Sequence, residues 1–176
     1  MSDNKKRIRM VAYSGIVAAL YVVFTIMVAP IAYGPIQCRI SEVLTILPAF
    51  AMGYVPGVSL GCLLANLFNP AGNLGPVDVI GGTLATVIAG VFSRLIGKKN
   101  KFLAIIPPIV SNGLIVGGYL PFLLIDDSSE ITATVVGISM LEVAASEAVL
   151  LLVVGIPIIL LINKTPRLRS LVEKIS

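Results

Sequence analysis

Residues 138–162 read ISMLEVAASEAVLLLVVGIPIILLI, and this stretch decides the fold class. Its only ionisable side chains are Glu142 and Glu147, and both lie in its first half. A helix crosses the ~30 Å hydrocarbon core of a bilayer with about 20 predominantly apolar residues. The stretch therefore predicts a transmembrane helix.

The rest of the chain has the same character, with 57% hydrophobic and only 12% charged residues. Further apolar runs of spanning length occupy residues 10–31, 77–92 and 102–125. Residues 40–68 are broken at Pro56-Gly57 into two pieces that are short for a crossing, so they form either two short crossings or one buried re-entrant hairpin. We expect an all-α integral membrane protein in which residues 1–176 form one domain, a bundle of six transmembrane helices whose helices 2 and 3 are short. Four helices plus a hairpin is the alternative.

The positive charges predict the orientation. The chain has 13 Lys and Arg residues, and all except Arg39 fall in three clusters of four. The first cluster is Lys5, Lys6, Arg7 and Arg9, the second is Arg94, Lys98, Lys99 and Lys101, and the third is Lys164, Arg167, Arg169 and Lys174. The loop at 126–130 is acidic. Because Lys and Arg accumulate in cytoplasmic loops, we expect both termini and the middle cluster to be cytoplasmic and the acidic loop external.

Several chemistries are excluded by composition. The chain has no His, and Cys38 and Cys62 form no metal-binding or redox spacing. The phosphate-binding loop of ATPases is also absent. We therefore expect no enzymatic activity, no metal and no cofactor, and the grouping of the charges at helix ends argues against nucleic acid as a partner.

Polar side chains inside predicted spans are costly in lipid and are functional candidates. Glu142 and Glu147 lie five residues apart and so project from different faces of their helix. We expect Glu142 to be the principal ligand anchor, with Glu147 as the second choice. Asn112, Tyr119 and Asn66 complete this group of candidate substrate-binding residues, although helix packing explains the glycine-rich surroundings of Asn112 and Tyr119 equally well.

The segment Gln37-Cys38-Arg39-Ile40-Ser41-Glu42 is the sharpest local feature outside the spans. Arg39 departs from the positive-inside pattern, which implies that another group holds it. Gln37, Arg39 and Glu42 are candidate substrate-binding residues at the outer lid. Alternatively, Ser41 caps helix 2 and Arg39 pairs with Glu42 without any ligand.

Helix 1 carries two overlapping pairs of small residues, Ser14 with Ala18 and Gly15 with Ala19. Small residues at this spacing allow another helix to approach closely. The stripe predicts docking of a partner membrane subunit, and internal packing is the alternative.

The run from Gly34 to Glu42, which follows a basic-led first helix, resembles the QueT family of substrate-binding S components of energy-coupling-factor (ECF) transporters. The resemblance rests on Gln37, Arg39, Ser41 and Glu42, and on the short helices around Pro56-Gly57. Cys38 stands where an aromatic residue is expected. The resemblance implies a multi-pass protein of the bacterial cell membrane that binds a queuine-like 7-deazaguanine.

The partners that the resemblance implies are an ECF coupling subunit and two ATPase subunits, with the small-residue stripe of helix 1 docking on the coupling subunit. A carboxylate accepts both donors on the edge of a guanine-like base, so Glu142 with Glu42 or Glu147 suits such a ligand. Two other functions stay open, an S component for another vitamin-like molecule and an autonomous small-molecule transporter.

Overall fold

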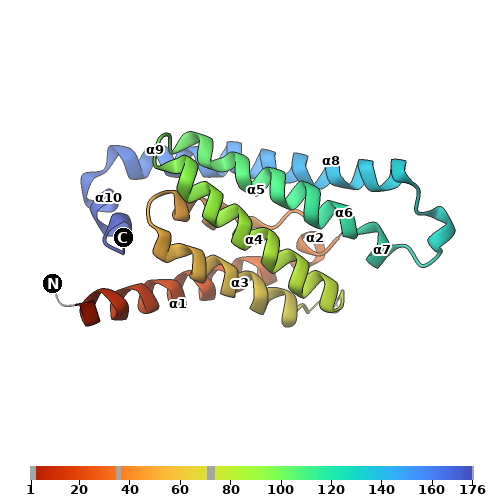
Figure 1. Cartoon of the computed structure of the whole chain (residues 1–176), viewed down its shortest axis with the longest axis horizontal. Helices are drawn as coiled ribbons and strands as arrows, with labels where there is room; N and C mark the ends of the chain where they lie inside the picture. The colour runs from red at the N-terminus through yellow and green to blue at the C-terminus, as the bar shows by residue number, and fades with distance from the viewer. Residues whose placement is uncertain (1–2, 35–36, 71–73, 176) are drawn as a thin grey trace.

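The computed structural model describes residues 3–34, 37–70 and 74–175, and every regular element in these ranges is a helix (Figure 1). The first half of the chain forms α1 (Asp3–Met27), α2 (Ala29–Ala32), the 3₁₀ helices η1 (Ile40–Ala49) and η2 (Met52–Tyr54), α3 (Val55–Leu67) and α4 (Pro76–Gly97). The second half forms η3 (Phe102–Ile105), α5 (Ile106–Ser111), η4 (Asn112–Val116), α6 (Gly117–Tyr119), α7 (Pro121–Leu124), η5 (Ser128–Glu130), α8 (Ala133–Leu150), η6 (Leu151–Gly155), α9 (Ile156–Lys164) and α10 (Pro166–Glu173).

The helical membrane fold expected from the sequence is confirmed. Among the described residues, four continuous helical stretches are long and apolar enough to cross a membrane, Arg7–Met27, Pro76–Gly97, Phe102–Tyr119 and Ala133–Lys164. Two shorter apolar helical stretches cover Ile40–Ala49 and Met52–Leu67. These correspond to the predicted short helices 2 and 3, and the count of six crossings stays a prediction.

The break between the two short helices lies earlier than the sequence suggested. The chain reverses through Ala51, whose backbone is extended, whereas Pro56 lies in the first turn of α3. The expectation of a break at Pro56-Gly57 is wrong because a proline in the first turn removes no hydrogen bond that the helix needs.

The tip of this hairpin is tied to the middle basic cluster. The side chain of Arg94 donates to the carbonyl oxygens of Ala49 at 3.2 Å and Phe50 at 2.7 Å, and Lys101 donates to Ala49 at 2.5 Å. Cationic side chains satisfy the free carbonyls at the end of a helix in this way. The hairpin of η1 and α3 therefore reaches the same end of the bundle as the basic residues.

The prolines of the last two spans lie where the helix changes type. Pro107 and Pro108 stand in the first turn of α5, which follows the 3₁₀ helix η3, and the π-helical η4 begins one turn later. Pro157 stands in the first turn of α9, directly after the π-helical η6. Each proline lacks the N–H that a continuous α-helix would use, and the helix changes type at these positions.

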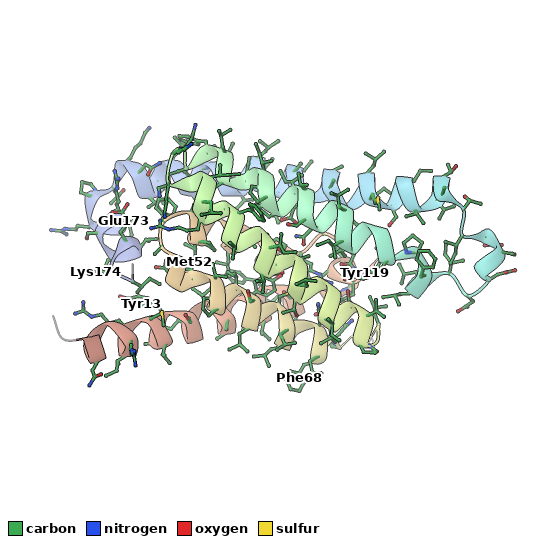
Figure 2. All side chains as sticks on the ribbon, viewed as in Figure 1. Tyr13, Met52, Phe68, Tyr119, Glu173 and Lys174 are labelled. Carbon is green, nitrogen blue, oxygen red and sulfur yellow. The ribbon has the colours of Figure 1, made fainter. Side chains whose placement is uncertain are left out.

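The two ends of the bundle differ in charge. Both chain ends and the turn between α4 and η3 lie at one end, whereas the acidic turn between α7 and α8 lies at the other (Figure 1). Large apolar side chains cover the outside, as Phe68 illustrates with 65% exposure (Figure 2). An apolar surface of this extent suits a lipid environment.

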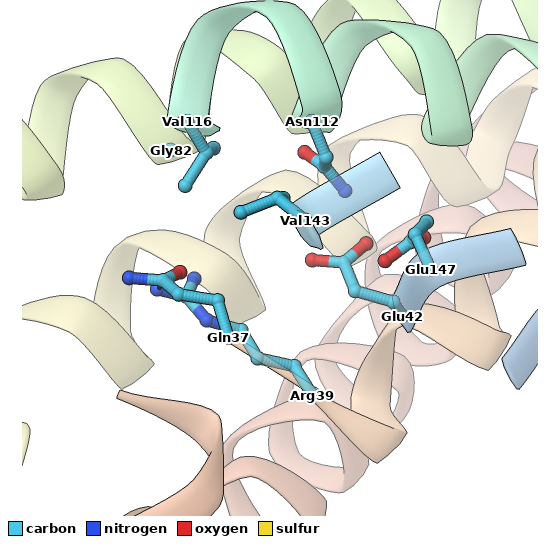
Figure 3. Close-up of a pocket in the computed structure, with 8 residues that line it drawn as sticks. All are labelled: Gln37, Arg39, Glu42, Gly82, Asn112, Val116, Val143 and Glu147. Atoms are coloured by element: carbon cyan, nitrogen blue, oxygen red, sulfur yellow. Dashed lines mark hydrogen bonds between the residues drawn. The ribbon is translucent and has the colours of Figure 1, made fainter. Parts of the chain in front are cut away.

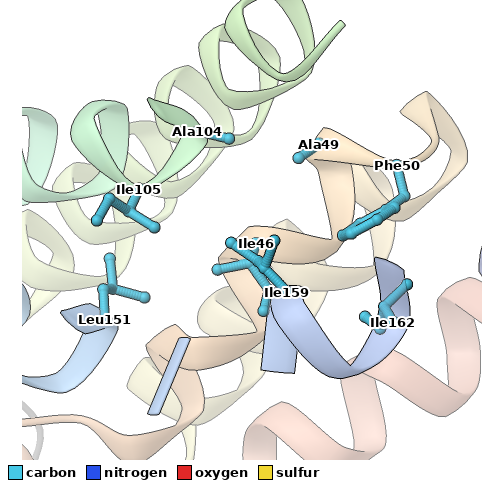
Figure 4. Packing of buried hydrophobic residues seen from close by; sticks show 8 residues of the cluster. All are labelled: Ile46, Ala49, Phe50, Ala104, Ile105, Leu151, Ile159 and Ile162. Atoms are coloured by element: carbon cyan, nitrogen blue, oxygen red, sulfur yellow. The ribbon is translucent and has the colours of Figure 1, made fainter. Parts of the chain in front are cut away.

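The core lies around η1. Eight buried side chains from η1, the hairpin turn, η3, η6 and α9 pack together (Figure 4), and they are Ile46, Ala49, Phe50, Ala104, Ile105, Leu151, Ile159 and Ile162. Because η1 is surrounded by the other helices, its polar residues are also buried. This burial positions the site described next.

Candidate functional site

A small cavity lies beside η1, toward the end of the bundle that carries the acidic turn. Its lining comes from the segment before η1, η1 itself, α4, η4 and α8 (Figure 3), and the lining residues are Gln37, Arg39, Glu42, Gly82, Asn112, Val116, Val143 and Glu147. The cavity volume is about 10 Å³, which is room for about one water molecule. The structure thus brings five of the eight predicted substrate-binding residues together in a closed site.

Two carboxylates dominate this site. Glu42 and Glu147 are 3% and 4% exposed, and the amide of Asn112 faces both (Figure 3). The hydroxyl of Tyr21 donates to Oε1 of Glu42. Oε2 of Glu42 and Oε1 of Glu147 are buried and have no hydrogen-bond partner among the described residues.

Arg39 lies on the other side of the cavity, and its side chain is held at four points. Its Nε donates to the carbonyl oxygen of Ala32 at 3.1 Å, its Nη2 donates to Oε1 of Gln37 at 2.8 Å, and Nη2 lies 3.6 Å from Oδ1 of Asp78. The guanidinium carbon lies 5.1 Å from the ring centre of Tyr33. Arg39 is therefore an immobile part of the wall, as its departure from the positive-inside pattern implied.

The alternative in which Arg39 and Glu42 form a capping pair is wrong. Arg39 takes Asp78 as its acidic partner, and the hydroxyl of Ser41 lies 2.6 Å from that of Thr25 on α1. At the N-terminal end of η1, the N-cap residue is Arg39, and its side chain makes no capping hydrogen bond. Burial decides this outcome, because Ser41 and Glu42 point into the bundle and find partners on α1 rather than at their own helix end.

Asp78 is the residue that the sequence reasoning missed as a site component. It is 1% exposed, and besides Arg39 it accepts a hydrogen bond from the hydroxyl of Tyr119 at 2.8 Å. Its backbone carbonyl accepts one from Nδ2 of Asn66 at 3.1 Å. The predicted residues Asn66 and Tyr119 thus support Arg39 through Asp78 and do not line the cavity. The available signal was an acidic residue in the first turn of a spanning helix.

Glu142 lies outside the cavity. Its side chain is exposed and borders two apolar surface grooves, one beside Leu120 and Ile125 and the other beside Cys38 and Val153. At 1.5 Å per residue, Glu142 is about 33 Å from Lys164 along the helix, whereas Glu147 is about 26 Å away. A ~30 Å core that begins at Lys164 thus leaves Glu142 at the membrane boundary. The cavity wall therefore includes Glu147 and not Glu142, and the role of either residue as the ligand anchor stays a prediction.

The loop residues next to Arg39 are partly shielded from water. Burial raises the pKa of Tyr33 to about 12, and its neutral hydroxyl donates to the carbonyl oxygen of Ala65 at 2.6 Å. Burial, with a smaller contribution from the Glu147 carboxylate, raises the pKa of the Cys38 thiol. Both side chains are therefore uncharged at neutral pH and add no charge to the site.

The four small residues of α1 divide into two faces. Ser14 and Ala18 pack against α3, where a Cβ on Gly57 would lie 2.9 Å from the carbonyl oxygen of Ser14 and a Cβ on Gly61 would lie 3.1 Å from Cα of Ala18. Gly15 and Ala19 are exposed. Internal packing therefore accounts for Ser14 and Ala18, and docking stays a prediction for Gly15 and Ala19.

Comparison with known proteins agrees with this architecture. The model of the QueT transporter family matches residues 11–164. The chain belongs to the QueT transporter family. With several apolar helices as well, this member of the family is a multi-pass membrane protein.

A curated relative in the family is the queuosine precursor transporter QueT of Lactococcus lactis subsp. cremoris (strain MG1363), which is 41% identical over 75 residues. The aligned part covers 42% of this chain and 42% of the relative. No solved structure matches the chain.

Proposed function

We propose that this chain is the substrate-binding membrane subunit of an ATP-driven ECF-type importer, and that it takes up a queuosine precursor with a 7-deazaguanine base. Membership of the QueT transporter family and the name of the curated relative support the part of this proposal that concerns transport of a queuosine precursor. The chain serves as a binding and transport subunit, and it has no enzymatic role.

The observation that carries the proposal is the pair of unpartnered carboxylate oxygens of Glu42 and Glu147 in the cavity. A buried carboxylate oxygen without a hydrogen-bond partner is costly, so these two atoms, which have none in the described part of the chain, favour a ligand that presents hydrogen-bond donors. Asp78 adds a third carboxylate nearby and Arg39 is the basic residue that faces them. The acidic excess also favours a cationic ligand.

A 7-deazaguanine base with an amine-bearing side chain has this complementary chemistry. The base presents an N–H and an exocyclic NH₂ on one edge, and a carboxylate accepts both. The amine is a charged donor for the second carboxylate. Glu147 and Glu42 therefore fill the two roles, and the amide of Asn112 faces both carboxylates (Figure 3).

The cavity must widen before such a base enters, because its present volume is about 10 Å³. Gln37 and Arg39, which precede η1, form part of the cavity wall. We assign the end of the bundle that bears the acidic turn to the outside of the cell and the basic end to the cytoplasm, following the positive-inside rule. Substrate then reaches Glu42 and Glu147 from outside.

Energy for uptake would come from partner subunits, since the sequence contains no phosphate-binding loop. Gly15 and Ala19 offer an exposed small-residue face on α1, and a Cβ on Gly15 would meet nothing within 4 Å. A helix of the coupling subunit fits against this face. The face on α1 that packs against α3 is already occupied.

Equilibrium binding to the purified chain tests the proposal. The ligands are queuine, 7-aminomethyl-7-deazaguanine and guanine, with thiamine, riboflavin and biotin as controls. We expect the deazaguanines to bind in preference to guanine and the vitamins. Selective binding of one of the vitamins, or no binding of either deazaguanine, would overturn the substrate assignment.

Reconstitution tests the coupling. Proteoliposomes that contain the chain alone should bind the deazaguanine without accumulating it, and addition of the coupling and ATPase subunits with ATP should start uptake. Concentrative uptake by the chain alone would show an autonomous transporter instead.

A further inference from the structure

The side-chain amide of Gln37 can adopt only one orientation in this site. Its Oε1 accepts a hydrogen bond from Nη2 of Arg39 at 2.8 Å. A guanidinium only donates hydrogen bonds, so rotation of the amide by 180° would set two donors against each other. The NH₂ group of Gln37 is therefore directed away from Arg39.

Arg39 in turn cannot move to accommodate a rotated amide. It is 4% exposed, and its remaining contacts are with the carbonyl oxygen of Ala32 and the carboxylate of Asp78. The guanidinium is planar and rigid, so these contacts fix the direction of the N–H groups that face Gln37. Asp78 thus acts on Gln37 through Arg39.

The backbone of Gln37 adds a second sign of constraint. Its φ is 49°, in the left-handed region, which a residue with a side chain adopts at a cost. The backbone N–H of Gln37 donates to the carbonyl oxygen of Gly34 at 3.0 Å and stabilises this turn. The amide of Gln37 lies at the cavity, on the side opposite the two glutamates (Figure 3).

Nε2 of Gln37 is buried and has no hydrogen-bond partner among the described residues. In the same part of the chain, the cavity atoms of Glu42 and Glu147 that lack partners are acceptors. Among the described cavity-lining residues, the buried atoms without partners are therefore two acceptors on one side and one donor on the other. A ligand that satisfies these atoms carries donors on one edge and an acceptor opposite Gln37.

We propose that Gln37, oriented by Arg39, is the residue that selects a base with a ring carbonyl and rejects bases with an amino group at that position. The proposal rests on the proposed function, which supplies the 7-deazaguanine class of ligand. On this base the carbonyl at position 6 is the acceptor for Nε2. An amino group at position 6 would place two donors against each other.

Competition binding with two bases tests this selection, 7-deazaguanine and 2,6-diamino-7-deazapurine. The two bases differ in the substituent at position 6 and in the proton on the adjacent ring nitrogen. Both are titrated against the wild-type chain and Gln37→Glu, which keeps the size of the side chain and replaces the donor with an acceptor. For each protein, the preference is the affinity for 7-deazaguanine divided by the affinity for 2,6-diamino-7-deazapurine. The ring proton affects this preference equally in the wild-type chain and in Gln37→Glu, so its effect cancels when the two preferences are compared.

We expect the preference for the carbonyl base to fall about 10- to 100-fold in Gln37→Glu, the range for one mismatched buried hydrogen bond. Gln37→Met, which has neither donor nor charge, should also reduce the preference, and it supplies a readout if Gln37→Glu does not fold. An unchanged preference in the folded variants would overturn the proposal.

Arg39→Lys tests the orienting role separately. Lysine keeps the positive charge opposite Asp78 but lacks the planar fork that holds both Asp78 and Gln37. The freed amide can then rotate, so we expect the preference to fall although Gln37 is intact. A wild-type preference in Arg39→Lys would show that Arg39 does not orient Gln37. If the wild-type chain binds neither base, the proposed function itself has failed, a result distinct from binding without a dependence on Gln37.

Discussion

Nη2 of Arg39 lies 3.6 Å from Oδ1 of Asp78, and this ion pair joins the loop before η1 to the first turn of α4. Both side chains are almost completely buried, at 4% and 2% exposure. Removing one partner of a buried ion pair leaves an uncompensated buried charge. This lowers the stability of the fold more than replacing both partners by apolar residues does. The stability of the outer end of the bundle should therefore depend on Asp78.

Asp78→Asn should lower the free energy of unfolding by about 3 kcal/mol, because Arg39 keeps its charge and loses its carboxylate partner. Thermal unfolding in detergent measures the effect. Asp126→Asn, in the exposed loop before η5, is the matched control and should leave the midpoint unchanged. Equal midpoints for the two variants would contradict the role of the ion pair.

Glu147→Gln should weaken binding of 7-aminomethyl-7-deazaguanine about 10- to 150-fold, since a buried charged hydrogen bond is worth about 1.5–3 kcal/mol. Glu142→Gln makes the same chemical change on the same helix at an exposed position. It should bind as the wild-type chain does. Calorimetric titration of both variants decides between them, and the reverse pattern would return Glu142 to the site.

Gly61→Ala should destabilise the bundle by roughly 1–3 kcal/mol, because overpacking forces neighbours to shift. The added Cβ would lie 2.5 Å from Cβ of Tyr21 on α1. Gly15→Ala, on the open face of α1, should have equal or slightly higher stability, since alanine favours helices over glycine. Unfolding midpoints of the two variants provide the measurement, and a loss in both would mean that α1 packs on both faces.

Gly15→Leu and Ala19→Leu should block transport without affecting binding. Leucine at either position obstructs the close approach of a partner helix, while the cavity lies elsewhere in the bundle. Substrate affinity of the isolated chain and co-purification with the coupling subunit are both measured. Lost affinity with intact co-purification would place this face inside the fold.

Cysteine labelling in intact cells tests the orientation. In a background that carries Cys38→Ser and Cys62→Ser, Ser129→Cys should react with a membrane-impermeant thiol reagent and Asn100→Cys should not. The basis is the concentration of positive charge at the end that holds Asn100. Labelling at Asn100 alone would invert the topology.

Much of the fold could be predicted from the sequence because the bilayer fixes the length of a spanning helix and the side on which basic residues gather. The four long spans coincide with apolar runs, and the three basic clusters meet at one end as the positive-inside rule requires (Figure 1). The position of the hairpin turn does not follow, since Pro56 is equally compatible with a break and with the first turn of a helix. Tertiary contacts of Ala49 and Phe50 with Arg94 and Lys101 decide it.

The site was only partly predictable, for a related reason. Gln37, Arg39 and Glu42, the candidates taken from the motif around Arg39, all line one cavity, and substrate binding by them stays a prediction. The sequence could not show which of Glu142 and Glu147 points into the bundle. Helix α8 is apolar around most of its circumference, so its hydrophobic periodicity does not reveal the inward face. Asp78 was missed because its partner is 39 residues away in sequence.

The closed cavity has a consequence for the time course of binding. A base cannot enter a volume of about 10 Å³, so association must wait for the cavity to widen. The observed association rate should then level off at high concentrations of base, at the rate of this opening. The apparent dissociation constant equals the intrinsic one divided by the fraction of time the site is open, so it is the larger of the two. The same contacts that shield the glutamates therefore also give a bound base a long residence time.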